Sequence, residues 1–398
     1  MFLLLCMLDV VSAVIGKTDF SLSQGQLNTF LWFGFFKGGE IELKVSAQSD
    51  GNLNFGIYLC TPENYNIILQ EDYGKEYCGV NNTNEFICRE LKHFSQSYPM
   101  RNLNIRSIIE EYITYWFVVA SCADESVEIK VSYEVTNPGG EQLSSGVLEI
   151  KYLALGFFIA WCGLLLIWII KWIIVYRKRP NYIQIGLIVN CIIWGAFSAI
   201  IYWFLHDFST DGKPSSVLLR ASIWLFITAE CCFFVVLQMI STGICIRNNK
   251  FEKLTGIKMI FNIVLIMICY MLYVIIGTLS FFVLSGAYVL LLIFYIYDVR
   301  KVIREITLDM ERMVDSGQEI IESPVWYQVR MYRTFMISLI IFLLGLGTIS
   351  GIYIYYYYMP WIGVGAHIYI IFNSVLILSS YFRFQHDSPY WFSDPMRV

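Results

Sequence analysis

The chain has 398 residues, of which 57% are hydrophobic, 17% aromatic and only 15% charged, and its mean hydropathy is +0.57. This composition excludes an ordinary soluble globule, in which charged residues alone approach about a quarter of the total. The net charge of −4 divides into −9 for residues 1–151 and +5 for residues 152–398, a split that fits opposite compartments and argues against a nucleic-acid partner.

The chain begins with an apolar run, and Val11-Ser12-Ala13 offers small residues at positions that a signal peptidase reads. We therefore expect a signal peptide at residues 1–13. Because Asp9 interrupts the run and no Lys or Arg precedes it, a buried N-terminal strand is the alternative.

Residues 14–136 show an alternation of apolar and polar side chains that is typical of short strands. The clearest examples are residues 29–36, 40–45, 53–59 and 126–133. The pattern predicts a lumenal or extracellular antiparallel β-sandwich, followed by a linker at residues 137–151. Residues 102–112 depart from the alternation, and there we expect a short helix or a connecting loop.

Four cysteines precede the membrane part, and an even number in a secretory compartment predicts two disulfides. The four are Cys60, Cys78, Cys88 and Cys122. Sequence permits three pairings, and we favour Cys60 with Cys122, since both end hydrophobic strands, and Cys78 with Cys88. The second bond would close the polar loop whose Asn81 heads a glycosylation sequon. Zinc is disfavoured because no two of these cysteines have Cys-x-x-Cys spacing.

Residues 152–170 contain no charged side chain and are long enough, as a helix, to cross a hydrocarbon core of roughly 30 Å. Six more apolar blocks follow, at about 182–205, 217–246, 259–276, 278–297, 334–358 and 361–382. They predict a seven-transmembrane-helix bundle over residues 152–383. Residues 259–297 must fold back near Gly277, because one helix of that length would measure nearly twice the bilayer core.

Lys and Arg gather in alternate loops, which the positive-inside rule assigns to the cytosol. The β-sandwich is then lumenal, the C-terminal tail at 384–398 is cytosolic, and residues 206–216 form a lumenal loop. In that loop His206, Asp207 and Asp211 could hold a weak metal site, but a solvated loop is strongly favoured.

Residues 298–333 carry apolar side chains at helical spacing, and Ser323-Pro324 has the character of a helix start. We expect the fifth helix to extend outward and to form a cytosolic helical hairpin with the sixth. A platform for a cytosolic trafficking partner is the alternative meaning of this hairpin.

Several segments resemble one family. The resemblance is carried, in chain order, by Leu-Asn-Thr-Phe at 27–30, Phe-Gly-Phe-Phe-Lys-Gly-Gly at 33–39, Asn-Pro-Gly-Gly at 137–140 and Phe-Arg-Phe-Gln at 382–385. These segments are similar to the GOLD-domain seven-helix family, also called lung seven transmembrane receptor-like. The resemblance implies a GOLD-like β-sandwich on seven helices and a role in Golgi or endosomal trafficking. It implies architecture better than activity, because members have been proposed as cargo chaperones, receptors or channels.

Signatures of other classes are missing from the sequence. The third apolar block ends Ile-Cys-Ile-Arg at 244–247, without the acid-Arg-Tyr triplet of rhodopsin-like receptors. There is no HExxH, no Gly-rich phosphate loop and no nucleophile elbow. We therefore expect no catalytic residues, no cofactor and no metal site.

Glu230 lies near the middle of the third apolar block, where a carboxylate costs several kcal/mol unless it is neutral, paired or wetted. Helical spacing puts Gln238 and Ser241 on a similar face, and His367 in the seventh block is the best ionisable partner. These four residues could line a cavity for a lipid headgroup, a lipidated cargo segment or an ion. Equally, Glu230 could be a neutral acid that only fixes helix packing.

These observations together predict a non-enzymatic membrane protein of Golgi or endosomal membranes, with the plasma membrane as a further location. Its expected partners are membrane lipids and a lumenal protein cargo or ligand, and its expected role is cargo sorting. A seven-helix receptor or ion channel is the alternative.

Overall fold

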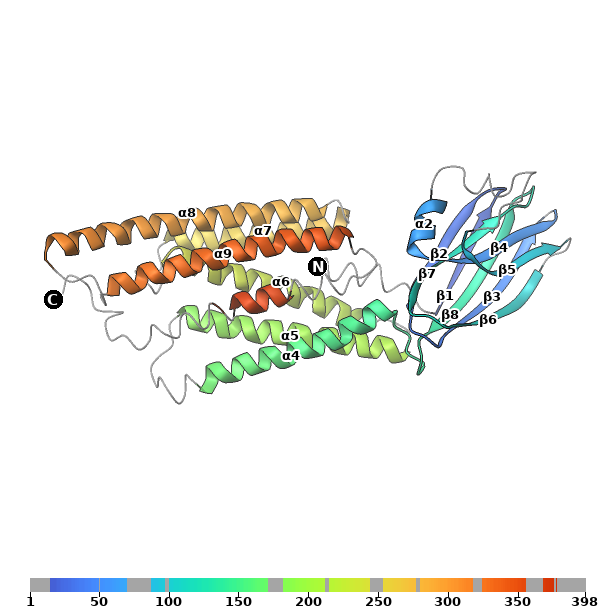
Figure 1. Cartoon of the computed structure of the whole chain (residues 1–398), viewed down its shortest axis with the longest axis horizontal. Coiled ribbons are helices and arrows are strands. Elements are labelled where there is room, and N and C mark those ends of the chain that lie inside the picture. Colours follow the sequence, from blue (N-terminus) through green and yellow to red (C-terminus); the bar gives the residue numbers. More distant parts are fainter. Residues whose placement is uncertain are drawn as a thin grey trace.

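A computed structural model places a β domain at one end of a set of long helices (Figure 1). It describes residues 15–49, 51–69, 87–96, 100–170, 182–211, 215–243, 253–276, 280–317, 324–355, 368–375 and 377. The expected signal peptide at 1–13, the sequon at Asn81, His367 and the tail at 384–398 lie outside the described residues.

The β domain consists of two four-stranded antiparallel sheets, as predicted. Its strands are β1 (Ile15–Leu22), β2 (Leu27–Phe35), β3 (Gly39–Ser49), β4 (Leu53–Cys60), β5 (Arg89–Gln96), β6 (Met100–Ile109), β7 (Ile113–Ser121) and β8 (Val127–Thr136). Sheet A has the order β1-β8-β3-β6, and sheet B has the order β2-β7-β4-β5. The two inner faces enclose one core, in which Phe55 and Phe94 lie 4.7 Å apart between ring centroids.

The expectation of a helix or loop at 102–112 is wrong, because β6 occupies most of that stretch and pairs with β3. The apolar residues Leu103, Ile105 and Ile109 are separated by two and four positions, and they fit a strand as well as a helix. Ser107 takes an inward position on the strand and breaks the apparent alternation. Pairing with β3 decided the outcome.

A second, smaller apolar cluster lies on the outer face of sheet B, beneath the short helix α2 (Pro62–Ile68). Thr61 caps this helix by accepting a hydrogen bond from the backbone N–H of Asn64, and Pro62 occupies its first turn. Ile68 points into the cluster, which consists of Tyr58, Cys60, Ile68, Cys88, Val118 and Ala120. The helix therefore covers one end of the outer face of sheet B.

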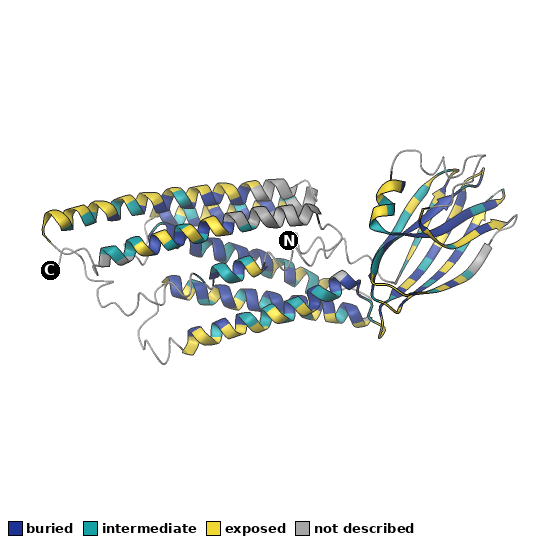
Figure 2. Cartoon of the chain, viewed as in Figure 1, coloured by how far each residue is buried: buried dark blue, intermediate teal, exposed yellow. Residues whose placement is uncertain are grey.

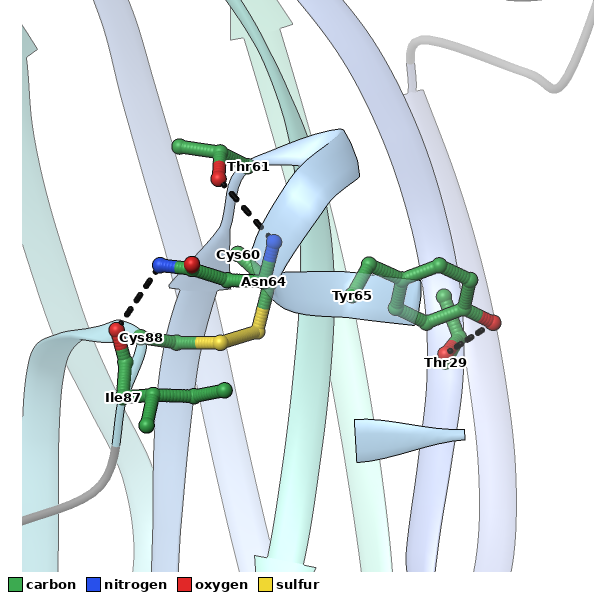
Figure 3. The surroundings of a disulfide bond; sticks show 7 residues. All are labelled: Thr29, Cys60, Thr61, Asn64, Tyr65, Ile87 and Cys88. Carbon is green, nitrogen blue, oxygen red and sulfur yellow. Dashed lines mark hydrogen bonds between the residues drawn. A yellow bond between two sulfur atoms is a disulfide. The ribbon is translucent and has the colours of Figure 1, made fainter. Parts of the chain in front are cut away.

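The disulfide beside α2 joins Cys60 to Cys88 (Figure 3), so the favoured pairings of Cys60 with Cys122 and of Cys78 with Cys88 are wrong. Cys60 ends β4 and Cys88 precedes its neighbour β5, which brings their Cα atoms within 4.6 Å. Cys122 lies at the opposite end of β4, because its N–H donates to the carbonyl of Asn54. It is also disulfide-bonded, and Cys78 lies outside the described residues.

The helices follow the β domain. They are α4 (Ser145–Ile170), α5 (Tyr182–Asp211), α6 (Ser216–Ser241), α7 (Lys253–Ile276), α8 (Ser280–Asp315) and α9 (Pro324–Tyr355), and residues 368–375 are also helical. Within the described residues, three helices are long and apolar enough to cross a membrane: Val147–Ile170, Tyr182–Thr210 and Ser216–Ser241. Three such helices are compatible with a membrane protein, although the part of the chain that the structure describes does not show the seven expected spans.

Several boundaries can be compared with the predictions. The expected break near Gly277 separates α7 from α8, α8 continues to Asp315, and α9 begins at Pro324, as the hairpin prediction required. Two boundaries differ. Helix α4 starts at Ser145, inside the expected linker 137–151, and α5 runs to Asp211, so residues 206–211 are helical and do not form the expected loop.

Many residues on the outer faces of the helices are exposed (Figure 2), and large apolar side chains are among them. Trp203 is 66% exposed and Val217 is 68% exposed, although both belong to candidate spans. Inside, Trp161 of α4 stacks on Trp194 of α5 at 6.2 Å, and Trp194 meets Phe226 of α6 edge to face. Large apolar side chains on both the inside and the outside of a helix are expected where lipid replaces water.

Candidate functional site

The junction between the β domain and the helices is built around the buried side chain of Asn137. Its Oδ1 accepts from the N–H of Phe36 at 2.7 Å. Its Nδ2 donates to the carbonyls of Gly34 at 3.2 Å and Leu143 at 2.7 Å. One amide thus ties the end of β2 to the segment that leads into α4.

Gly34 brings α4 against sheet B. Its N–H donates to the Ser144 hydroxyl at 2.9 Å. A Cβ at this position would collide with Ser145 Oγ and lie 2.9 Å from Ser144 Oγ. A side chain at position 34 would therefore force the Ser144 and Ser145 hydroxyls to move, and glycine lets the start of α4 lie close to β2.

A buried lysine extends the junction to the second span. Lys151 of α4 donates to the Ser209 hydroxyl of α5 at 3.0 Å and lies 3.5 Å from the Glu141 carboxylate. The backbone N–H of Gln142 donates to the carbonyl of Ser209 at 3.2 Å. The connecting segment is therefore held by α4 and α5 together, and these contacts hold the β domain on the first two spans.

A tyrosine completes the junction on its exposed side. The hydroxyl of Tyr112 donates to a Glu149 carboxylate oxygen at 3.4 Å. Partial burial and then the negative charge of Glu149 raise the pKa of Tyr112 above its ordinary value. The hydroxyl keeps its proton at physiological pH and remains a donor.

A second set of polar side chains lies inside the helical bundle. Glu230 of α6 is 1% exposed, and the hydroxyl of Tyr288 in α8 donates to its Oε2 at 3.4 Å. The contact joins two helices, as expected if the acid contributes to packing.

Gln238 is the centre of a larger network that joins α6, α7 and α8. Its Nε2 donates to Asp298 at 3.0 Å and to Ser241 at 3.3 Å, while its Oε1 accepts from Asn262 at 2.9 Å. Asn262 also donates to the hydroxyl of Tyr295 at 3.0 Å. All five side chains are buried, and both ends of the Gln238 amide are satisfied.

The network ends in an ion pair between Asp298 of α8 and Lys258 of α7. The Lys258 ammonium lies 2.6 Å and 2.8 Å from the two carboxylate oxygens. Asp298 is buried, whereas the Lys258 side chain is 38% exposed, so the pair sits at the edge of the polar core. The Asp298 carboxylate thus has both an ammonium and an amide as partners.

The sequence-predicted cavity residues are only partly brought together. Gln238 and Ser241 share one hydrogen-bond network, Glu230 contacts Tyr288, and His367 lies outside the described residues. These contacts match the packing interpretation of the polar stripe, and the cavity stays a prediction. A small apolar pocket lies elsewhere, between α6, α9 and the last helical segment, and is lined by Phe233, Leu237, Phe335, Ser338, Leu339, Phe342 and Ser374.

Four members of the polar core were missed from the sequence: Lys258, Asn262, Tyr295 and Asp298. Asn262 could have been noticed, because it is the only Asn, Gln or charged residue in the block 259–276. Lys258 and Asp298 were assigned to cytosolic loops because each lies where an apolar block meets charged residues. Within the described residues, no group of three or more His, Cys, Asp or Glu could hold a metal ion, including at His206, Asp207 and Asp211.

The fold and the junction define a class. The N-terminal two-sheet β domain is hydrogen-bonded to the start of a helical part, which contains three helices long and apolar enough to cross a membrane and a buried polar core. Comparison of this chain with protein-family models and with curated proteins finds no match.

Proposed function

We propose that this protein is a non-enzymatic, multi-pass membrane protein of the secretory pathway that sorts lumenal cargo. In this proposal the β domain is a lumenal GOLD-like recognition module, and all seven apolar blocks span the membrane. The N-terminus is lumenal, the C-terminus is cytosolic, and the membranes are those of the Golgi and endosomes. The location and the family rest on the sequence resemblance and on the loop charges.

The observation that carries the proposal is the junction around Asn137. A flexible tether would let the β domain bind cargo without any effect on the helices. Here Asn137, Gly34 and Ser144 join β2 to α4, and Lys151 joins α4 to Ser209 of α5. Because the contacts are buried, cargo binding can change the relative stability of helix arrangements across the membrane.

The hairpin of α8 and α9 offers the matching surface on the cytosolic side. Helix α8 continues to Asp315, and its outer part exposes Leu308 and Val314. A cytosolic trafficking partner that recognises apolar side chains on a helix could bind this extension at 298–333.

The test is a comparison in cells that lack the protein. We expect a set of lumenal or secreted proteins to be mislocalised, and wild-type protein to restore them. Asn137→Ala should restore them poorly although it reaches the same compartment, whereas Asn28→Ala, on the exposed part of β2, should act as wild type. Normal cargo distribution in cells without the protein would refute the sorting role.

A receptor or ion channel is the second candidate, favoured by the polar core. Glu230, Gln238 and Asp298 place ionisable and polar groups inside apolar helices, as ion pathways do. Currents from purified protein in liposomes that are abolished by Glu230→Gln would establish this function instead.

A further inference from the structure

We propose that the outer face of sheet B rests on the interface of the same bilayer that the helices cross. The aromatic face, as we call it, consists of Trp32, Trp116 and Tyr65 together with the exposed residues Ile67 and Leu69. Its partner is the headgroup layer of the membrane, and this contact goes beyond the proposed sorting role.

Three aromatic rings form a continuous stack on this face. Trp32 of β2 and Trp116 of β7 are cross-strand partners, with ring centroids 5.8 Å apart. Tyr65 of α2 stacks on Trp116 at 4.4 Å with an angle of only 3° between the rings. The Tyr65 hydroxyl is held by the Thr29 side chain at 3.1 Å (Figure 3). The stack is ordered by its own contacts, although all three rings remain partly exposed.

The same face of sheet B is in contact with the start of α4, the first candidate span. Side chains two positions apart on a strand point to the same face, so Trp32 lies on the face of Gly34, about 7 Å along β2. On β7, Trp116 bears the same relation to Thr114, the cross-strand partner of Gly34. A Cβ at Gly34 would meet Ser144 and Ser145 at the start of α4.

The position of this attachment determines the direction in which the aromatic face points. The candidate span begins at Val147, only two residues after Ser145. The rings therefore stand next to the point where the chain enters the membrane. Figure 1 likewise shows α2 on the side of the β domain that faces the helices.

The chemistry of the face suits a lipid headgroup layer. Trp and Tyr are enriched where a membrane meets water, because each has an apolar body and a polar tip. Beyond the rings, Ile67 is 44% exposed and Leu69 is 62% exposed, and the only charged residue in α2 is Glu63. Exposed aliphatic groups at this site can enter the boundary between headgroups and acyl chains.

The opposite side of the β domain has the contrary character. The outward positions of β3 and β8 in sheet A include Glu42, Lys44, Glu128 and Lys130, and Glu42 pairs with Arg106 at 2.9 Å. This charged face suits water. The two faces of one sandwich thus differ as the membrane-facing and solvent-facing sides of a peripheral domain differ.

The experiment uses the full chain, labelled with 5-fluorotryptophan, in nanodiscs of zwitterionic lipid. Fluorine resonances are assigned with Trp32→Phe and Trp116→Phe. Their relaxation is measured with a spin label on the lipid headgroup and, separately, with a soluble gadolinium chelate. Lys130→Trp supplies a matched reporter on the opposite face, where residue 130 is exposed.

We expect the headgroup label to relax Trp32 and Trp116 at least about threefold more than the reporter at 130, and the soluble chelate to show the reverse order. Leu69→Glu should reduce the effect of the headgroup label on Trp116. Equal relaxation at all three positions would overturn the proposal. Protection of the two tryptophans from both agents would also overturn it, because protein and not lipid would then cover the face.

Discussion

Replacing Asn137 by alanine tests whether the junction holds the β domain on the helices. The substitution removes three side-chain hydrogen bonds and leaves the Phe36 N–H and the carbonyls of Gly34 and Leu143 without that partner. Two of the three bonds are buried and the third is partly buried. The backbone of β2 and the start of the linker lose their shared attachment.

The size of the effect follows from these contacts. A hydrogen bond contributes about 1 kcal/mol net, and a buried group left unsatisfied costs about 1 to 3 kcal/mol. Because the Phe36 bond is only partly buried, we assign about 1 kcal/mol to each of the three. The local opening free energy of the junction should fall by about 3 kcal/mol, and at about 1.4 kcal/mol per tenfold change this is roughly a hundredfold.

Hydrogen exchange of the full chain in nanodiscs measures this opening directly. Peptides that cover residues 34–37 and 141–146 should exchange about a hundredfold faster in Asn137→Ala than in wild type. Asn28→Ala, an exposed asparagine on the same strand, should leave both peptides unchanged. Exchange of the junction peptides within about threefold of wild type in Asn137→Ala would refute the role given to this side chain.

Three further predictions concern the disulfide, the ion pair and the buried acid. Non-reducing peptide mapping should recover a peptide linked between Cys60 and Cys88, and a peptide linking Cys60 to any other cysteine would contradict the structure. Replacing both cysteines by serine should destabilise the β domain by about 3.5 kcal/mol, because the bond closes a separation of 28 residues. Lys258→Met should lower the unfolding free energy by about 2 kcal/mol, discounted for the partly exposed ammonium. Adding Asp298→Asn should restore much of that loss, and strictly additive costs would show that the pair is not coupled. Glu230→Gln keeps the shape and the tyrosine contact, so thermal stability should hold or rise; a marked loss would mean that the charged form is required.

The hydropathy pattern alone was enough to predict a β domain followed by long apolar helices. Alternation of period two predicted the antiparallel sandwich, and the apolar blocks predicted membrane helices. The helix boundaries near Gly277 and Pro324 were predicted from the maximum length of a membrane helix and from the preference of proline for the first turn of a helix. These properties depend on local sequence, so no tertiary contact was needed to find them.

Two of the wrong predictions, the element at 102–112 and the cysteine pairing, share one cause, because each depended on residues far apart in the chain. Residues 102–112 became a strand because β3 supplied hydrogen-bond partners, and Cys60 met Cys88 because β4 and β5 are neighbours in sheet B. Sequence spacing does not reveal which strands are adjacent.

The sequence by itself determined the order of an N-terminal β-sandwich and long apolar helices, because the apolar and polar pattern of each segment indicates which of its faces are buried. Only the tertiary structure decided which polar groups meet: Asn137 with the end of β2, Lys258 with Asp298, and Trp116 with Tyr65. Hydrogen bonds and ring stacking require atoms within a few ångströms, and such proximity between distant segments arises only when the whole chain has packed.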